Sequence, residues 1–207
     1  MKKFCTPLIV LFACGFLFGQ TIDLPIPKKT GGMPLMEALA KRVSIREYDT
    51  KEISMQQLSN LLWASFGVNR ADGRRTAPSA SNKQEIDIYV LLKKGAYLYD
   101  AQNNKLNQIT TEDLRSQATD KGFADAPIQL IFIADLAKRG ENSEEGKLRT
   151  ANIDCGYISQ NTNLFCTSEG LVTRPRGSVN RDILISKLNL RADQKILLAH
   201  SVGFPKP

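Results

Sequence analysis

The sequence predicts an α+β fold, in which a β-sheet is flanked by helices. Helical and strand patterns both occur along the chain, but they do not alternate one by one as they do in a doubly wound sheet. Neither GxGxxG nor GxxxxGK[ST] is present, so neither a Rossmann site nor a P-loop is indicated. With 207 residues, 42% of them hydrophobic, the chain is long enough for one domain with its own core.

Two helices are expected at the start of this domain. A helix over Met33–Arg42 would place Leu35, Met36, Leu39 and Ala40 on one side. A second helix is expected to begin after Ser54, because Ser54 and Gln57 have the spacing of a capping box, and to end at Gly67. Its core-facing side would be formed by Leu58, Leu61, Leu62 and Phe66.

Strands dominate the middle of the chain. The segment IDIYVLL, residues 86–92, is typical of a strand, and the next residues are typical of a hairpin that turns near Asn103 and Asn104. A polar helix is expected over Thr111–Lys121. Residues Pro127–Ala134 are almost all apolar, which favours a strand in the centre of the sheet.

The last third of the chain predicts a long helix over Gly146–Glu169, a shorter helix over Asn180–Leu188 and a final strand, KILLAHSVGFP. Cys155 and Cys166 both fall on the long helix. At 1.5 Å rise per residue they are about 16 Å apart, too far for a disulfide within that helix. We therefore expect two buried free thiols, and their spacing matches no zinc site.

The N-terminus has the layout of a secretory signal: Lys2 and Lys3, an apolar run, then a small residue. This predicts three parts, with residues 1–19 as a signal peptide, 20–32 as an extended arm and 33–207 as the folded domain. The protein would be exported and periplasmic. Cys14 lies in LFAC, which loosely resembles a lipoprotein box, so a soluble product and one anchored to the membrane through Cys14 both stay open.

The net charge of the full chain is +7. Basic residues are spread along the sequence and form no cluster interleaved with aromatic residues, so we expect no nucleic-acid partner. A mild positive excess suits a solvated surface or the attraction of small anions. An exported basic domain that binds surface polyanions is one alternative for the function.

The first motif that could bind a ligand is KRVSIREYD, residues 41–49. Arg42, Ser44 and Arg46 alternate in a segment that leaves a helix, so their side chains point the same way if the segment is extended. Two guanidinium groups and a hydroxyl can hold a phosphate, because arginine donates hydrogen bonds in a fixed fork. The alternative is an exposed basic edge without a ligand.

The second motif is RTAPSASN, residues 75–82, directly ahead of a predicted strand. Pro78 stiffens the loop, while the small residues Ser79, Ala80 and Ser81 let backbone amides approach a ligand closely. Asn82 adds amide donors and acceptors. Alone, this segment could be a tight surface turn.

Taken together with DCGYISQNTNLFCTSEGL, PRGSV and HSVGFP, these motifs resemble the FMN-dependent nitroreductase-like superfamily, in particular its minimal branch related to the SagB-type dehydrogenases. The resemblance extends from about Met36 to Pro205. It implies a central mixed or antiparallel sheet flanked by helices, and an intertwined homodimer with two FMN molecules at the interface.

The resemblance also implies which residues contact FMN. Arg42, Ser44 and Arg46 would hold the phosphate and ribityl chain, with Arg46 near the pyrimidine edge, and Lys206 would add a positive charge at the phosphate. The ring and tail would be lined from the partner subunit by Pro78, Ser79, Ala80, Ser81 and Asn82.

A third group of residues is implied at the N5 edge of the flavin ring, namely Pro175, Arg176 and Gly177, where the family offers a backbone amide. Some members have an acidic residue in place of Arg176. Whether Arg176 changes the charge preference for substrates is therefore left open.

By the same resemblance, the protein would be an FMN-dependent oxidoreductase that transfers hydride or electrons in a ping-pong cycle to a small electron-poor acceptor such as a nitroaromatic or a quinone. NAD(P)H is the usual donor in the family, but an exported enzyme would not meet it. A quinol, a redox protein or the substrate itself stays open as the donor, and in the last case the enzyme would be a dehydrogenase or an oxidase. A non-catalytic flavin-binding protein is a further alternative.

No side chain of the protein is expected to act as a nucleophile. The sequence offers no Ser-His-Asp or Cys-His set, and the single histidine, His200, falls within a strand pattern. We expect His200 to pack or to form hydrogen bonds in the interior. The flavin would carry the chemistry, and the protein would bind and tune it.

Overall fold

The computed structural model describes residues 20–119 and 126–207. The predicted signal segment, including Cys14, lies outside the described residues. The seven strands of the described part form one sheet in the order β1-β4-β3-β2-β5-β7-β6. They are β1 (Thr21–Asp23), β2 (Ile86–Leu92), β3 (Gly95–Asp100), β4 (Lys105–Thr110), β5 (Ile128–Asp135), β6 (Val172–Arg176) and β7 (Gln194–Gly203).

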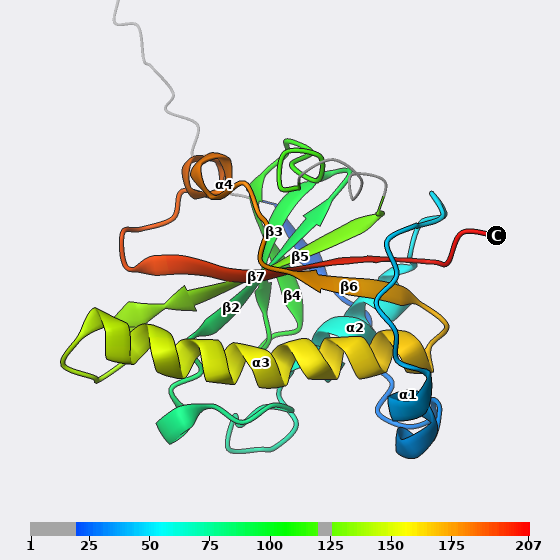
Figure 1. The fold of residues 1–207 in the computed structure, drawn as a ribbon, viewed down its shortest axis with the longest axis horizontal. Helices are drawn as coiled ribbons and strands as arrows, with labels where there is room; N and C mark the ends of the chain where they lie inside the picture. The colour runs from blue at the N-terminus through cyan, green and yellow to red at the C-terminus, as the bar shows by residue number, and fades with distance from the viewer. Residues whose placement is uncertain (1–19, 120–125) are drawn as a thin grey trace, which may run out of the picture.

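Helices flank this sheet on both faces, with α4 on one side and α2 and α3 on the other (Figure 1). The helices are α1 (Leu35–Lys41), α2 (Met55–Phe66), α3 (Glu144–Ser168) and α4 (Arg181–Lys187), and two single turns are η1 (Ala80–Asn82) and η2 (Leu136–Lys138). The predicted α+β class is confirmed. Neighbouring strands in the described sheet all pair antiparallel, which decides between the mixed and the antiparallel sheet.

Strand β5 lies in the middle of the sheet, between β2 and β7, as its apolar sequence predicts. All eight of its residues are buried. Because successive side chains of a strand point to opposite faces, Leu130 and Phe132 pack in the core with α2 and α3, while Ile131 and Ile133 pack in the core with α4. The sheet therefore supports two hydrophobic cores, one on each face.

Helix α2 begins and ends where the sequence predicts. The Ser54 hydroxyl accepts a hydrogen bond from the backbone N–H of Gln57, and the Gln57 side chain accepts one from the backbone N–H of Ser54, which completes the capping box. Gly67 is the C-cap residue. The four predicted core residues are buried, namely Leu58, Leu61, Leu62 and Phe66.

Three expectations about the elements are wrong. Residues 111–119 form turns rather than the start of a polar helix. The Thr110 hydroxyl accepts from the N–H of Glu112 and the Asp113 carboxylate from that of Arg115, and such local bonds compete with helix formation. Strands β1 and β6 were not expected, since each is short and carries a weak strand pattern.

Helix α1 is confirmed, but its apolar residues do not face the core. Only Ala38 is buried, whereas Leu35 and Met36 are 62% and 76% exposed. Leu39 and the following Val43 are also exposed. A soluble chain seldom leaves such a group of large apolar side chains in water unless another surface covers it.

Candidate functional site

Arg42, Ser44 and Arg46, which are predicted to hold a phosphate, lie in a segment called the clamp segment below. This segment lies along the edge of the sheet. After α1, Ser44 pairs in parallel with Thr173 of β6, and the N–H of Ile45 donates to the carbonyl of Thr173 at 3.3 Å. Ile45 packs inward, while Ser44 and Arg46 on either side of it are exposed. The segment is thus extended, as the alternating pattern predicts.

Arg42 and Arg46 of this segment form no ion pair within the part of the chain that the structure describes. Arg42 is half-buried and Arg46 is exposed, and neither guanidinium group has a side-chain hydrogen bond among the described residues. An arginine without a carboxylate partner keeps its donors available for an external anion. Arg42 and Arg46 therefore form a basic surface at the β6 edge that is suited to a phosphate.

The C-terminal residues lie beside the same segment. The N–H of Asp49 donates to the carbonyl of Phe204 at 3.0 Å, and Tyr48 forms an antiparallel bridge with Pro205. Lys206 follows directly and is exposed. The structure thus brings Lys206 close to the segment that contains Arg42 and Arg46, although the two are about 160 residues apart in the sequence.

Arg176, at the end of β6, directs its guanidinium group into the protein. The residue is 4% exposed, and its side chain donates to Gln129 Oε1 at 2.8 Å and to the carbonyl of Ser178 at 2.6 Å. At this position Pro175 is half-buried and Gly177 is exposed, while the Arg176 side chain is enclosed. The Arg176 charge is held within the protein and does not meet a substrate directly.

The second predicted motif has an unusual backbone. Ser81, Asn82 and Gln84 have φ angles of 53°, 51° and 49°. Left-handed backbone at residues other than glycine costs about 1–3 kcal/mol each and is common at ligand-binding sites. The Ser79–Gln84 segment, called the strained loop below, is therefore held in this shape by other contacts.

Two of those contacts come from buried charged residues that the sequence analysis did not assign to the loop. The N–H of Ala80 donates to Asp154 Oδ2 at 2.8 Å, and Arg139 Nη1 donates to the carbonyl of Ala80 at 3.2 Å. Arg139 Nη1 also lies 3.3 Å from Glu85 Oε1. No pattern in the sequence connects Arg139 with Ala80, since they come from different elements and meet only in the fold.

The segment ahead of α1 and the strained loop are attached to different parts of α3. The hydroxyl of Ser168 accepts from the N–H of Met33, just ahead of α1, whereas Asp154 holds Ala80. These two positions of α3 are 14 residues apart, which is about 21 Å along the helix. Figure 1 shows α1 near one end of α3 and η1 near the other half. The clamp residues themselves follow α1 and pair with β6, and no hydrogen bond among the described residues joins the two motifs.

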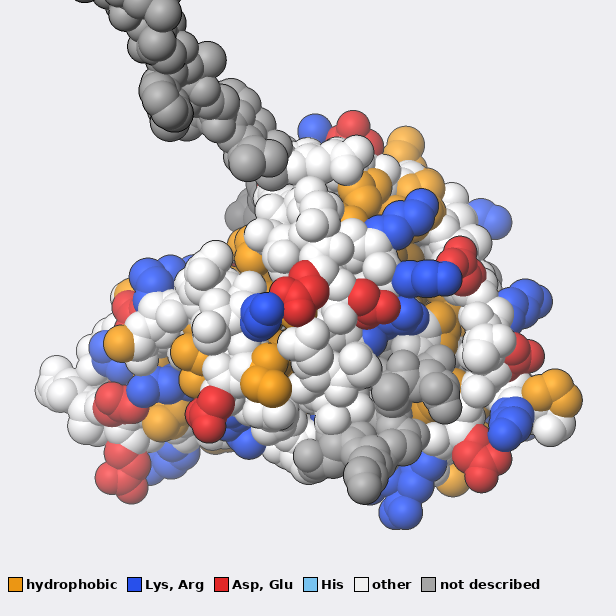
Figure 2. Space-filling model, turned by 90° about the horizontal axis from the view of Figure 1, so that it is seen from above, with side chains coloured by type: hydrophobic (Ala, Val, Ile, Leu, Met, Phe, Trp, Pro, Cys, Tyr) orange, Lys and Arg blue, Asp and Glu red, His pale blue; other side chains and the backbone are white. Residues whose placement is uncertain are grey.

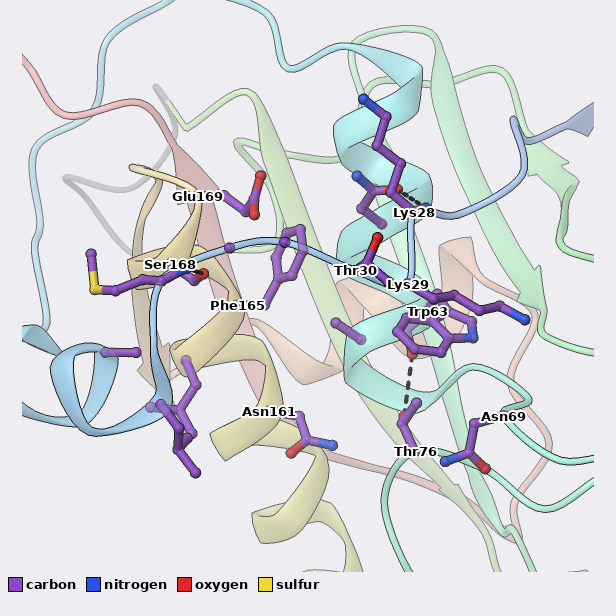
Figure 3. Close-up of a pocket in the computed structure, with 18 residues that line it drawn as sticks. Lys28, Lys29, Thr30, Trp63, Asn69, Thr76, Asn161, Phe165, Ser168 and Glu169 are labelled. Carbon is purple, nitrogen blue, oxygen red and sulfur yellow. Dashed lines mark hydrogen bonds between the residues drawn. The ribbon is translucent and has the colours of Figure 1, made fainter.

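A cavity of about 640 Å³ lies along α3 between these two regions. Figure 3 shows Trp63 of α2 and Phe165 of α3 on its walls, with the amides of Asn69 and Asn161 and the residues of the 28–33 segment around them. The Trp63 indole N–H donates to the carbonyl of Val68 at 2.9 Å. None of the residues predicted to bind FMN lines this cavity.

His200 is buried and takes part in hydrogen bonds, which confirms the structural role expected for it. Its Nδ1 lies 3.1 Å from the Thr173 hydroxyl, which itself donates to the carbonyl of Ser201. Nδ1 therefore carries the proton, and Nε2 accepts from Ser159 Oγ at 2.8 Å. Burial, together with the nearby charge of Arg176, lowers the pKa of His200 to about 3.

Tyr48 and the two cysteines of the described residues are also enclosed. The hydroxyl of Tyr48 donates to the carbonyl of Ile45 at 2.9 Å, and burial raises its pKa to about 12. Cys155 and Cys166 are free and buried, as expected, and burial raises the pKa of both thiols. None of these groups is suited to acid–base or nucleophilic chemistry near neutral pH.

Charges alternate in sign over the face of the molecule that Figure 2 shows, where Lys and Arg are interspersed with Asp and Glu. The expectation that the protein has no nucleic-acid partner stays a prediction. Among the residues that the structure describes, no helix has the length and apolarity needed to cross a membrane.

The family model described as "Nitroreductase family" matches residues 39–204 of the chain. This range contains every predicted FMN contact except Lys206, which lies two residues beyond it. A protein of Methanocaldococcus jannaschii, named as a candidate nitroreductase, is 30% identical over 166 residues, which is 75% of this chain and 83% of that protein.

Solved structures agree with the sequence comparisons. A crystal structure of a candidate nitroreductase from Ralstonia eutropha has a TM-score of 0.85 and 36% identity, and the match covers 90% of both chains. The McbBCD microcin synthetase complex of Escherichia coli has a TM-score of 0.70 at 15% identity, covering 100% of this chain and 85% of that one. The second similarity concerns the fold alone.

Proposed function

Since the chain belongs to the nitroreductase family and is an oxidoreductase, we propose that it works with FMN bound between two copies of the chain. The observation that carries this proposal is the group of cations at the β6 edge. Arg42 and Arg46 have no acidic partner among the described residues, and Lys206 lies beside their segment. A phosphate monoester is the part of FMN that such a donor set fits.

The strained loop would contribute to the same site from the partner subunit. Its small residues leave room for a ring, and its backbone shape is one that binding sites often have. Assembly from two chains is supported by the different attachments of the two motifs, because the clamp segment pairs with β6 whereas the loop is bonded to Asp154 and Arg139.

Exposed apolar residues supply a surface on which a second copy could dock. Leu35, Met36 and Val43 lie on or next to α1, and Ile153 and Tyr157 lie on α3. Burying large apolar side chains is the main source of stability in permanent homodimers. The proposed dimer would bury these residues and complete the FMN site.

FMN, when bound, would supply hydride and electron transfer, which no side chain of the protein supplies. The role of Arg42, Ser44, Arg46 and Lys206 would be to hold its anionic end. The backbone of Pro175 to Gly177 would border the ring, with Arg176 fixed from behind by Gln129 and Ser178. His200 would not exchange protons with a substrate, because it is neutral and enclosed.

The proposals for the substrates and the location rest on the sequence. We propose that the reductant is NAD(P)H if the protein acts in the cytoplasm, and a quinol, a redox protein or the substrate itself if residues 1–19 direct export to the periplasm. The acceptor would be a small electron-poor organic molecule. Initial rates measured at several concentrations of donor and acceptor should give the parallel reciprocal plots of a ping-pong cycle.

The decisive experiment is the absorbance spectrum of the freshly purified protein, followed by anaerobic titration with candidate donors and then acceptors. A flavin spectrum that is bleached by a donor and restored by an acceptor supports the proposal. A yellow protein that no donor reduces favours the non-catalytic flavin-binding alternative, and a colourless protein that takes up no added FMN contradicts both.

Variants locate the phosphate end. Arg42→Ala or Arg46→Ala should release most of the flavin, because each removes a cation that forms no ion pair among the described residues. Arg74→Ala is the matched control, since Arg74 is exposed and pairs with Asp72. Full flavin occupancy in both clamp variants would rule out the clamp.

A further inference from the structure

Two buried charged side chains bind the backbone of one residue of the strained loop, Ala80. Asp154 accepts from the N–H of Ala80 at 2.8 Å, and Arg139 donates to the carbonyl of the same residue at 3.2 Å. Both backbone polar groups of Ala80 are thus bound from outside the loop, and its carbonyl also accepts from the N–H of Lys83 within the loop at 3.2 Å. Ala80 directly precedes the left-handed residues Ser81 and Asn82.

Bonds within the loop do not by themselves fix its position on the protein. The N–H groups of Asn82 and Gln84 donate to the carbonyl and the hydroxyl of Ser79, at 2.9 and 3.0 Å. Those bonds determine the shape of the turn. The bonds of Ala80 to Asp154 and Arg139 connect the turn to α3 and to the residue after η2.

The charged side chains that make these connections have a large desolvation free energy when they are buried. Glu85, Arg139 and Asp154 are each 8% exposed or less. Arg139 faces three carboxylates, since it also pairs with Glu141. Glu85 Oε2 has no hydrogen-bond partner among the described residues, and burial raises the pKa of this carboxyl.

Such a cluster is poorly explained as a source of stability. Buried ion pairs often contribute less than apolar side chains of the same volume would, because desolvation opposes the attraction between the charges. The need to hold the loop in a particular backbone shape explains the cluster better, because an apolar side chain cannot form a hydrogen bond with a peptide N–H or carbonyl.

We propose that Asp154 and Arg139 are positioning residues that hold the strained loop in the shape that binds the flavin of the neighbouring subunit. Neither side chain touches the flavin. They act through the two polar groups of Ala80, and flavin affinity depends on them although both are enclosed. This inference rests on the proposed function, because the ligand of the loop is the FMN proposed above.

The test compares three variants of the full chain. Asp154→Leu keeps the branched shape of the side chain and removes the acceptor for Ala80 N–H, and Arg139→Met removes the side-chain donor to the Ala80 carbonyl. Asp154→Asn keeps an oxygen that can accept from Ala80. Ser159→Ala is the control, because Ser159 is a buried polar residue on the same helix that bonds to His200 and forms no hydrogen bond with the loop among the described residues.

The first measurement is the dissociation constant of FMN, obtained by titrating the apoprotein and following flavin fluorescence. Asp154→Leu and Arg139→Met should weaken binding about 10- to 100-fold, which is the effect of losing one charge-assisted hydrogen bond. Asp154→Asn should bind more tightly than Asp154→Leu, and Ser159→Ala should bind within about twofold of the parent chain, even where its melting temperature falls.

The second measurement does not need flavin. Hydrogen exchange of the peptide that spans residues 76–86 should become faster in the Asp154→Leu and Arg139→Met apoproteins than in the parent or in Ser159→Ala. Arg139→Met keeps the test decisive if Asp154→Leu does not fold, because it removes the other bond to Ala80.

The outcomes separate the two ideas. Faster loop exchange with unchanged FMN affinity overturns the positioning role while leaving the proposed function intact, and so does a loss of affinity in Ser159→Ala equal to that in Asp154→Leu. If the parent chain takes up no FMN, the proposed function fails and the positioning role with it, whatever the loop exchange shows.

Discussion

Replacing His200 by glutamine should remove a large part of the acid sensitivity of folding. His200 is completely buried, and its two ring nitrogens face the hydroxyls of Ser159 and Thr173. Its pKa is lowered to about 3, chiefly by burial and further by the charge of Arg176. Glutamine is neutral at every pH of interest and can bond to both hydroxyls.

The direction of the effect follows from the protons bound in each state. Below about pH 6.5 the unfolded chain protonates this histidine, whereas the folded chain does so only near pH 3. Between these values the unfolded state binds more protons, so stability falls as the pH falls. From pH 7 to pH 4.5 the two pKa values give a loss of about 2–3 kcal/mol.

Two measurements check this prediction. His200 is the single histidine of the chain, so its ring signals in an NMR spectrum can be followed alone and should not titrate between pH 8 and pH 5. Urea unfolding at fixed protein concentration should show that the parent chain loses about 2–3 kcal/mol more than His200→Gln between pH 7 and pH 4.5.

Other titrating groups, such as Glu85, are present in both proteins and largely cancel in the comparison. A ring signal that titrates near pH 6.5, or parallel pH profiles of the two proteins, would show that the histidine is accessible to protons. The reasoning from burial would then be wrong.

Three further substitutions test the fold. Phe66→Ala should destabilise the protein by about 3–5 kcal/mol in urea unfolding, because the ring is fully buried in the core between the sheet and α3; a loss under 1 kcal/mol would contradict that packing. Ser54→Ala should lower the free energy of unfolding by about 1 kcal/mol by removing the cap of α2. Gly95→Ala should cost at least about 1–3 kcal/mol, because Gly95 has a φ of 138° and an added Cβ would lie 2.2 Å from the Thr110 carbonyl oxygen. Gly140→Ala, where nothing lies within 4 Å, is its control and should change the melting temperature little.

The sequence predicts most of the fold because strong patterns coincide with most of the elements. The capping box at Ser54 and the all-apolar run of β5 correspond to local or strongly buried structure, and both are confirmed. The failures are segments whose structure depends on partners. Strand β1 exists through its pairing with β4, and β6 through its pairing with β7. In place of the helix expected from residue 111, the described residues up to 119 form turns, because side chains bond to nearby backbone N–H groups. The periodicity of apolar residues contains no information about such bonds.

The exposed side of α1 shows a different limit. Helical spacing correctly predicts that Leu35, Met36 and Leu39 share a side of the helix, but spacing does not say which surface covers that side. In the chain described here the side is open to solvent. A second copy is our proposal for what covers it, and only a measurement of the oligomeric state in solution can test this.

The sequence by itself determined the fold class, the family and the two motifs, since these depend on local spacing and on residue types along the chain. The tertiary structure alone decided that Lys206 lies beside the clamp segment, that the Arg176 charge is enclosed and that Asp154 and Arg139 hold Ala80. The reason is that these contacts join residues from 47 to 157 positions apart, and a chain acquires such contacts only when its sheet and helices have packed.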